Sequence, residues 1–227
     1  MLLKTKGIVL RFVKYKETSV IATIYTQEEG LVSVIANSVR SKNSKGKIAL
    51  YQPLSLIELV IYHSNTKSIN RISDIRSYHP LHNLRQNPIK SSIGIFITEI
   101  INKCIKEEES NPPLFNFLQE SIVYLNEQDK GVNDFHLIFL LKLSLFLGFK
   151  PHSINDFINQ LPNASFYKED YNQHILNKFI SANYDTPLGI TNLFRQTLLN
   201  DIIAYYQNHM ELGKLKSIEI LHVLLLE

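Results

Sequence analysis

The chain has 227 residues, of which 44% are hydrophobic and 20% charged, and it contains eight Gly and eight Pro. This composition is that of an ordinary folded protein, and it excludes a disordered chain or a fibrous repeat. Cys104 is the single cysteine, which excludes an intramolecular disulfide and a multi-cysteine zinc site. The formal net charge is +3.

The positive charge is concentrated at one end of the chain. Residues 1–82 hold 12 Lys and Arg against 5 Asp and Glu, whereas residues 83–227 hold 12 against 16. Such polarity indicates an anionic partner for the first part of the chain. Nucleic acid is the favoured partner, and an anionic membrane surface is the alternative.

Secretion and membrane insertion are not expected from the sequence. Lys4 and Lys6 interrupt the opening segment, which is too short for a signal peptide. The most apolar stretch, from Leu137 to Phe149, carries Lys142 and falls short of the roughly 20 residues of a membrane helix. We therefore expect a cytoplasmic protein with no membrane partner.

Short runs rich in β-branched residues, separated by turn residues, predict a small β-barrel at the start of the chain. In one run Leu31, Ser33 and Ile35 face one side and the intervening residues face the other. A loop rich in Lys, Ser, Asn and Gly separates the third run from the fourth. The pattern favours a Greek-key barrel of the OB type, with an SH3-like barrel as the alternative. The predicted strands span residues 7–13, 18–26, 31–36, 54–62 and 69–78.

After His79 and Pro80 the hydrophobic period changes from 2 to 3.6. This change predicts an α+β protein with an OB-fold domain at 1–82 and an all-α domain at 83–227. Cys104 lies on the apolar stripe of the first long helix and is expected to act as a core residue, and Asp134 is expected to cap a later helix. The predicted helices cover residues 92–105, 114–125, 135–147, 156–161, 175–180, 187–212 and 217–226.

No motif indicates catalysis. Gly46-Lys47 lacks both the leading glycine and the hydroxyl of a phosphate-binding loop. His79 and His82 have no further ligands at metal-binding spacing, and Glu107-Glu108-Glu109 is typical of a solvated helix end. We expect no enzymatic activity, no metal and no cofactor.

The strongest local signal is a set of nine cations within the first 50 residues, interleaved with aromatic side chains. On an OB barrel, cations follow the phosphates along a groove while exposed rings stack on unpaired bases. Phe12 is expected to pack inside the barrel, whereas Tyr15 and Tyr51 are candidates for base stacking. The predicted DNA-binding residues are Lys6, Arg11, Lys14, Lys16, Arg40, Lys42, Lys45 and Lys47.

An ordered series of segments resembles the RecO family of bacterial recombination mediators, and it extends over nearly the whole chain. No single segment is specific, but their order and spacing together are. The segments are Lys6-Gly7-Ile8-Val9-Leu10, Tyr15-Lys16-Glu17-Thr18, Gly30-Leu31-Val32, Ala36-Asn37-Ser38-Val39-Arg40-Ser41, Leu50-Tyr51-Gln52-Pro53, Leu147-Gly148-Phe149-Lys150-Pro151, and the stretch from Leu212 to Leu221.

The resemblance implies an OB-fold joined to a helical domain in a nucleoid-associated protein that binds single- and double-stranded DNA and anneals complementary strands. It also implies work with RecR and the single-strand-binding protein SSB in loading RecA onto coated DNA. The chain departs from many family members in one respect, since residues 152–186 hold none of the four cysteines of their zinc module. We expect this region to be held instead by packing of aromatic residues, namely Phe157, Phe166, Tyr167, Tyr171 and Phe179. The alternative function is a protein-interaction scaffold with weak or RNA-directed nucleic-acid binding.

Overall fold

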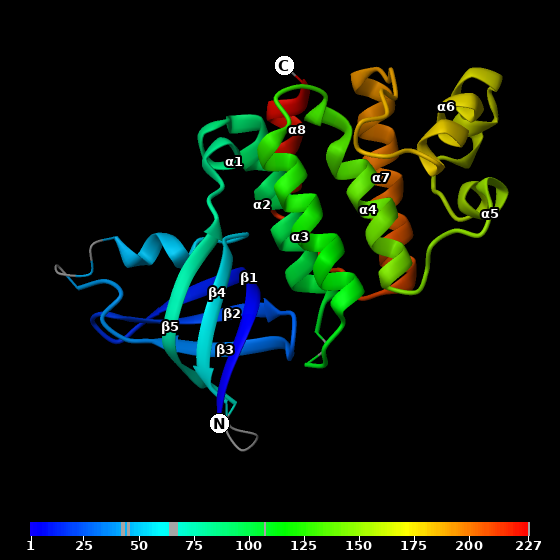
Figure 1. Ribbon diagram of the computed structural model, residues 1–227. Coiled ribbons are helices and arrows are strands. Elements are labelled where there is room, and N and C mark those ends of the chain that lie inside the picture. The colour runs from blue at the N-terminus through cyan, green and yellow to red at the C-terminus, as the bar shows by residue number, and fades with distance from the viewer. Residues whose placement is uncertain (42–43, 45, 64–67, 107, 227) are drawn as a thin grey trace. The chain divides into compact units, whose positions relative to one another are not determined.

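The computed structural model describes residues 1–41, 44, 46–63, 68–106 and 108–226 (Figure 1). This part of the chain divides into two compact units that alternate along the sequence. Residues 1–86 and 101–126 form the first unit, and residues 87–100 and those from 127 onward form the second. The predicted change from strand to helix near residue 82 is confirmed, whereas a division into independent domains at that point stays a prediction.

Within the described residues, five strands close into a barrel in the order β1-β2-β3-β5-β4, with β4 returning to β1 (Figure 1). Neighbouring strands are antiparallel except β3 and β5, which run parallel and pair Val34 with Asn70 and Ile35 with Arg71. The predicted OB-type barrel is therefore confirmed. The strands are β1 (Leu2–Tyr15), β2 (Ser19–Thr26), β3 (Gly30–Ala36), β4 (Leu56–Tyr62) and β5 (Asn70–His79).

β1 is long because it pairs with two neighbours. Its first half pairs with β4 and its second half with β2, and the register with β2 shifts between Val9 and Arg11. The shift leaves Leu10 as an extra residue, which is the geometry of a β-bulge. A bulge bends the strand, so a single β1 contributes to both sides of the closed barrel.

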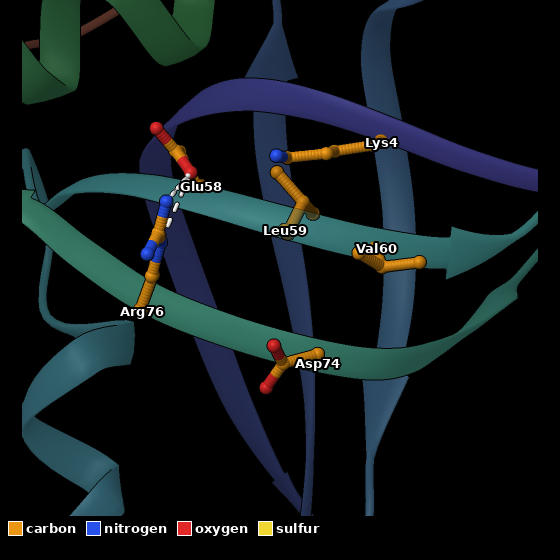
Figure 2. Close-up of a pocket in the computed structure, with 6 residues that line it drawn as sticks. All are labelled: Lys4, Glu58, Leu59, Val60, Asp74 and Arg76. Atoms are coloured by element: carbon orange, nitrogen blue, oxygen red, sulfur yellow. Dashed lines mark hydrogen bonds and ion pairs between the residues drawn. The ribbon is translucent and has the colours of Figure 1, made fainter.

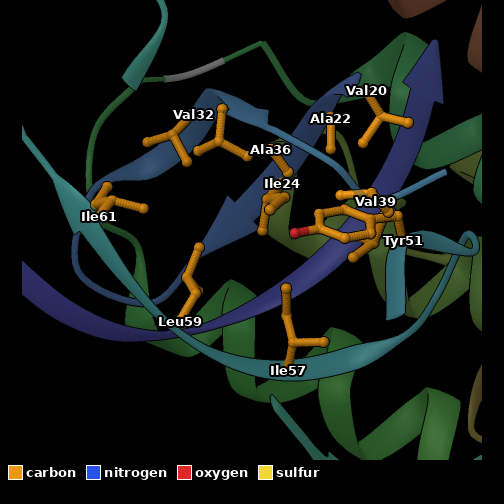
Figure 3. Packing of buried hydrophobic residues seen from close by; sticks show 12 residues of the cluster. Val20, Ala22, Ile24, Val32, Ala36, Val39, Tyr51, Ile57, Leu59 and Ile61 are labelled. Atoms are coloured by element: carbon orange, nitrogen blue, oxygen red, sulfur yellow. The ribbon is translucent and has the colours of Figure 1, made fainter. Parts of the chain in front are cut away.

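Alternate side chains of the strands fill the barrel interior (Figure 3). Val32, Val34 and Ala36 alternate with their neighbours as predicted, since successive residues of a strand face opposite sides, and it is this set that points inward. Tyr51, the last residue of the 3-10 helix η1 (Lys47–Tyr51), points its ring into the same aliphatic cluster. Gly7 also faces this interior, where a Cβ atom would lie 2.6 Å from Cγ2 of Ile24.

Residues 101–126 cover part of the barrel's outer surface within the first unit. The ring of Phe115, on α3 (Pro112–Glu127), lies 6.3 Å from the ring of Tyr25 on β2, which is fully buried although it faces away from the barrel interior. The Tyr78 hydroxyl donates a hydrogen bond of 2.6 Å to Oε1 of Gln119. This segment therefore completes the packing of the barrel.

The predicted helices are present with ends shifted by a few residues, whereas the short helix over residues 82–86 was not predicted. The helix expected from residue 187 begins at Asn192, because the Thr191 side chain caps it by accepting from the Phe194 N–H. Asp134 stands before α4, but its carboxylate accepts from Nε of Arg195 at 2.7 Å instead of capping the helix. The helices are α1 (His82–Gln86), α2 (Pro88–Cys104), α4 (Phe135–Phe146), α5 (Ile154–Asn159), α6 (Asp170–Ile180), α7 (Asn192–His209) and α8 (Ile218–Leu226).

The polar stretch 152–186, in which helices were predicted at 156–161 and 175–180, contains α5, η3 (Ala164–Lys168) and α6. Phe157 and Phe179 are buried as expected, and the Tyr167 hydroxyl donates to the carboxylate of Asp201 at 2.8 Å. The expectation for Tyr171 was wrong, since this side chain is 63% exposed. Across the described residues, no helix has the length and hydropathy that crossing a membrane requires.

Candidate nucleic-acid interface

The turn between β1 and β2 brings together several of the predicted DNA-binding residues. Arg11, Lys14 and Lys16 are all exposed, and Tyr15 between them is 39% exposed. The Lys16 ammonium lies 5.5 Å from the centre of the Tyr15 ring, which is within the range of a cation–π contact. We call these residues together with Arg40 the hairpin cluster.

Arg40 joins the hairpin cluster through the main chain of the turn. Its N–H donates to the carbonyl of Thr18 at 2.9 Å, and its guanidinium donates to the carbonyls of Ser19 and Lys16 at 3.2 and 2.6 Å. These bonds fix the segment after β3 against the β1–β2 turn. Arg40 therefore positions the turn in addition to contributing a positive charge.

Lys6 lies on a different face of the barrel from the hairpin cluster. It is paired in register with Glu58 on β4, and its ammonium lies 5.1 Å from the centre of the Tyr78 ring. Lys6 and Lys14 are eight residues apart along β1, which corresponds to about 26 Å of strand. Lys6 is therefore separated from the other predicted cations.

The surroundings of Lys6 carry charges of both signs (Figure 2). Nε of Arg76 donates to the Glu58 carboxylate at 3.0 Å, and this hydrogen bond holds the pKa of Glu58 below its usual value, with Lys4 and Lys6 acting in the same direction. A shallow pocket of about 290 Å³ on this face is lined by Lys4, Glu58, Asp74 and Arg76 among others. A face that presents carboxylates beside its cations is a poor match for a phosphate backbone.

The other predicted residues have different outcomes. Lys47 is exposed at the start of η1, whereas Lys42 and Lys45 lie outside the described residues. The expectation for Tyr51 was wrong, because its ring is 1% exposed and burial raises its pKa to about 12. No face of that ring is open to a base. Phe12 packs against the barrel core as expected.

A row of outward-facing residues runs across the barrel from the hairpin cluster. Strand register places Val13 opposite Ile21, Ile21 opposite Ile35, Ile35 opposite Arg71, and Arg71 opposite Tyr62. Residues that are paired in register lie on the same side of a sheet. Val13 is 55% exposed and Tyr62 52% exposed, so both ends of the row are open. We call these five residues the outer row.

A polar row lies directly beside the outer row. Arg11 is opposite Thr23, and Thr23 is opposite Ser33. Nε of Arg11 donates to Oγ1 of Thr23 at 3.2 Å, which holds the guanidinium over the outer surface of the barrel. The surface of strands 2 and 3 is where OB-folds bind oligonucleotides. Here it combines a cation, small hydroxyls and apolar side chains.

Sequence reasoning missed Tyr62 and Arg71. They stand on either side of a loop and looked unrelated to the basic set near the start of the chain. The parallel pairing of β3 with β5 brings Arg71 next to Ile35, 36 residues earlier. The available signal was an aromatic residue and a cation, each at the loop-facing end of a predicted strand.

No cluster that could hold a metal ion is present among the residues that the structure describes. The zinc module of many RecO proteins needs four cysteines, and this chain has one. The chain therefore does not fit that metal site.

Comparison with known proteins agrees with the fold. Residues 1–81 match the family model described as "Recombination protein O N terminal", and residues 85–177 match "Recombination protein O C terminal". The DNA repair protein RecO of Azobacteroides pseudotrichonymphae is 34% identical over 98% of each chain. Those of Phocaeicola vulgatus and Flavobacterium psychrophilum are each 35% identical over 97% of this chain and 98% of their own length.

A closed five-stranded barrel followed by helices defines the class of proteins with an OB-type barrel joined to a helical region. The chain belongs to the RecO family, as its two family models and its relatives along nearly the whole length show. Membership implies a role in DNA repair and recombination.

Proposed function

We propose that this protein is a DNA-binding recombination mediator that acts without a catalytic site or a cofactor. It binds single- and double-stranded DNA, anneals complementary strands, and assists RecR in loading RecA onto DNA coated with SSB. The observation that carries the proposal is the hairpin cluster, in which Arg11, Lys14 and Lys16 surround an exposed tyrosine on an OB barrel. The partner proteins are proposed from family membership alone.

The chemistry of the cluster suits contact with phosphates. Lysine and arginine that neutralise backbone phosphates release condensed counterions, which makes binding strong at low salt and independent of sequence. Such contacts form equally well with one strand or a duplex. Neutralising two complementary strands also reduces the repulsion that opposes their pairing, which is the requirement for annealing.

The outer row adds a preference for unpaired strands. Its apolar side chains offer surface to base faces that are stacked inside a duplex and exposed in a single strand. We therefore place single-stranded DNA along the outer row and the polar row, with the hairpin cluster at one end. Lys6 is left outside this path, because Glu58 and Tyr78 already engage it.

Two double variants with the same loss of charge test the proposal. Lys14→Gln/Lys16→Gln removes two cations of the hairpin cluster, and Lys4→Gln/Lys6→Gln removes two from the mixed-charge face. The first should reduce the slope of log affinity against log salt by about 1.4 for single-stranded DNA, at about 0.7 per lost phosphate contact. The second should leave the slope close to that of the unsubstituted protein. Equal effects of both pairs would rule out a localised interface.

Strand annealing gives the functional readout. The hairpin variant should anneal complementary oligonucleotides more slowly than the unsubstituted protein, with naked and with SSB-coated strands. If the unsubstituted protein retained no single-stranded DNA at low salt yet captured RecR or SSB, the scaffold function would replace the mediator function.

A further inference from the structure

The far end of the outer row opens into a pocket of about 600 Å³. It is lined by Ile35 of β3, Tyr62 at the end of β4, and Ile69 and Arg71 on either side of the first residue of β5, with His63 beside them. Tyr62, Ile69 and Arg71 are exposed. The pocket therefore lies open on the outer surface of the barrel, where β3 meets the ends of β4 and β5.

The side chains in this pocket differ in chemistry from those on the mixed-charge face. Isoleucines supply an apolar floor, Tyr62 supplies a ring, and Arg71 supplies a guanidinium. The described lining residues include no carboxylate, whereas Glu58 and Asp74 line the neighbouring pocket further along β4 and β5. One lining residue has an acidic contact, since Nε2 of His63 lies 3.9 Å from the Glu29 carboxylate. An apolar floor with an aromatic ring and a cation suits a flat aromatic group attached to an anion.

We propose that this pocket receives an unpaired base of single-stranded DNA, with the Tyr62 ring stacked on the base and Arg71 contacting the adjoining phosphate. This inference rests on the proposed function and deepens it. The outer row follows the curved surface of the closed barrel over four strand spacings from Val13 to Tyr62, or about 19 Å measured along that surface. A DNA strand bound from the hairpin cluster to the pocket would place about 4 nucleotides in contact with the barrel, which is the lower end of the site size of one OB-fold.

Single-stranded and double-stranded DNA are expected to use different parts of the barrel surface. A base paired inside a duplex cannot enter the pocket without being unstacked, whereas an unpaired base can. The hairpin cluster therefore serves both forms of DNA, and Tyr62 serves unpaired strands. Tyr62→Ala, which removes the ring, is expected to weaken binding to single strands and leave duplex binding unchanged.

The test compares the full-length protein with the variants Tyr62→Ala and Tyr62→Phe. Tyr171→Ala is the matched control, because Tyr171 is also an exposed tyrosine and lies in the second unit. The probes are a thymidine oligonucleotide and an oligomer of the same length made of abasic sites, which has the same phosphates and no bases. Affinity is measured by fluorescence anisotropy at several salt concentrations, and thermal unfolding confirms that each variant is folded.

The unsubstituted protein, Tyr62→Phe and Tyr171→Ala should bind the thymidine oligomer about 5- to 150-fold more tightly than the abasic oligomer, the loss expected for one base stack. Tyr62→Ala should lose most of this preference with its salt slope unchanged. Arg71→Gln should instead reduce the slope by about 0.7.

The possible failures are distinguishable. If the unsubstituted protein bound neither oligomer, the proposed function itself would fail. If it bound both and Tyr62→Ala kept the full preference for bases, the DNA-binding function would stand and the base pocket would be overturned. A matching loss in Tyr171→Ala would also overturn it.

Discussion

The Arg40 guanidinium donates a hydrogen bond of 2.6 Å to the main-chain carbonyl of Lys16, 24 residues earlier in the chain. Lys16 has a positive φ of 50°, which is an uncommon backbone conformation for a lysine. This conformation orients the Lys16 carbonyl that accepts the bond. A second bond from Arg40 to the Ser19 carbonyl closes the arrangement. Arg40 therefore adds a positive charge to the hairpin cluster and also holds the geometry of its turn.

Arg40→Lys is expected to weaken DNA binding although it conserves the charge. A lysine ammonium cannot span two carbonyls as the planar guanidinium does, so the turn should loosen. We expect about a fivefold loss of affinity for single-stranded DNA, equivalent to about 1 kcal/mol, and faster hydrogen exchange in the β1–β2 turn. Lys47→Arg, an exposed exchange of cation type, is the control. Identical binding by Arg40→Lys and the unsubstituted protein would contradict the positioning role.

Gly7→Ala is expected to destabilise the barrel. The added Cβ atom would lie 2.6 Å from Cγ2 of Ile24 and 3.1 Å from Cδ2 of Leu59, both in the packed interior. Forcing an extra methyl group into a close-packed core costs about 1–3 kcal/mol. Urea unfolding should show the corresponding fall in the midpoint. A midpoint unchanged from that of the unsubstituted protein would show that the interior has room that the structure does not display.

Cys104 is expected to react slowly with thiol reagents in the folded protein. Burial raises its pKa to about 12, against the smaller opposing effects of Lys103 and Lys106. At pH 8 the thiolate would then be about one part in 10⁴ of the total. Labelling with a disulfide reagent should be slow in buffer and fast in concentrated urea, and absent in Cys104→Ser. Equal rates in buffer and urea would show that the thiol is accessible and ionisable.

His136 is expected to make the second unit sensitive to acid. Its ring is fully buried, and neither ring nitrogen has a hydrogen-bond partner among the residues that the structure describes. Burial, with smaller effects from Arg195 and His222, therefore lowers its pKa from 6.5 to about 3. Between these values the unfolded chain binds one proton more than the folded chain. The contribution of His136 to the free energy of unfolding is therefore fully present above pH 6.5. It falls by about 1.4 kcal/mol per pH unit as the pH decreases toward 3.

The His136 prediction is tested by urea unfolding at pH 7, 6 and 5. His136→Leu should flatten the pH dependence of the free energy of unfolding by close to one proton, whatever its effect at pH 7. His174→Leu, a substitution at an exposed histidine, is the control and should not change the dependence. Parallel curves for His136→Leu and the unsubstituted protein would show that His136 does not govern acid stability.

Local features of this fold could be predicted from the sequence, and features that depend on long-range pairing could not. Inward-facing Val32 and Val34 follow from the two-residue period of a strand. The neighbourhood of Ile35 and Arg71 follows from a parallel pairing between distant segments, which no local pattern encodes. Tyr51 was misjudged because its lysine-rich surroundings in sequence suggested a surface position. Its burial depends on how η1 meets the barrel.

The alternation of the two units along the chain has a consequence for synthesis on the ribosome. All five barrel strands emerge before Phe115, the residue that covers Tyr25, has been made. Residues 87–100, which belong to the other unit, are translated in between. A nascent chain halted after β5 would hold all five barrel strands but not the residues that cover Tyr25. The first unit is thus completed only when residues 101–126 have left the exit tunnel.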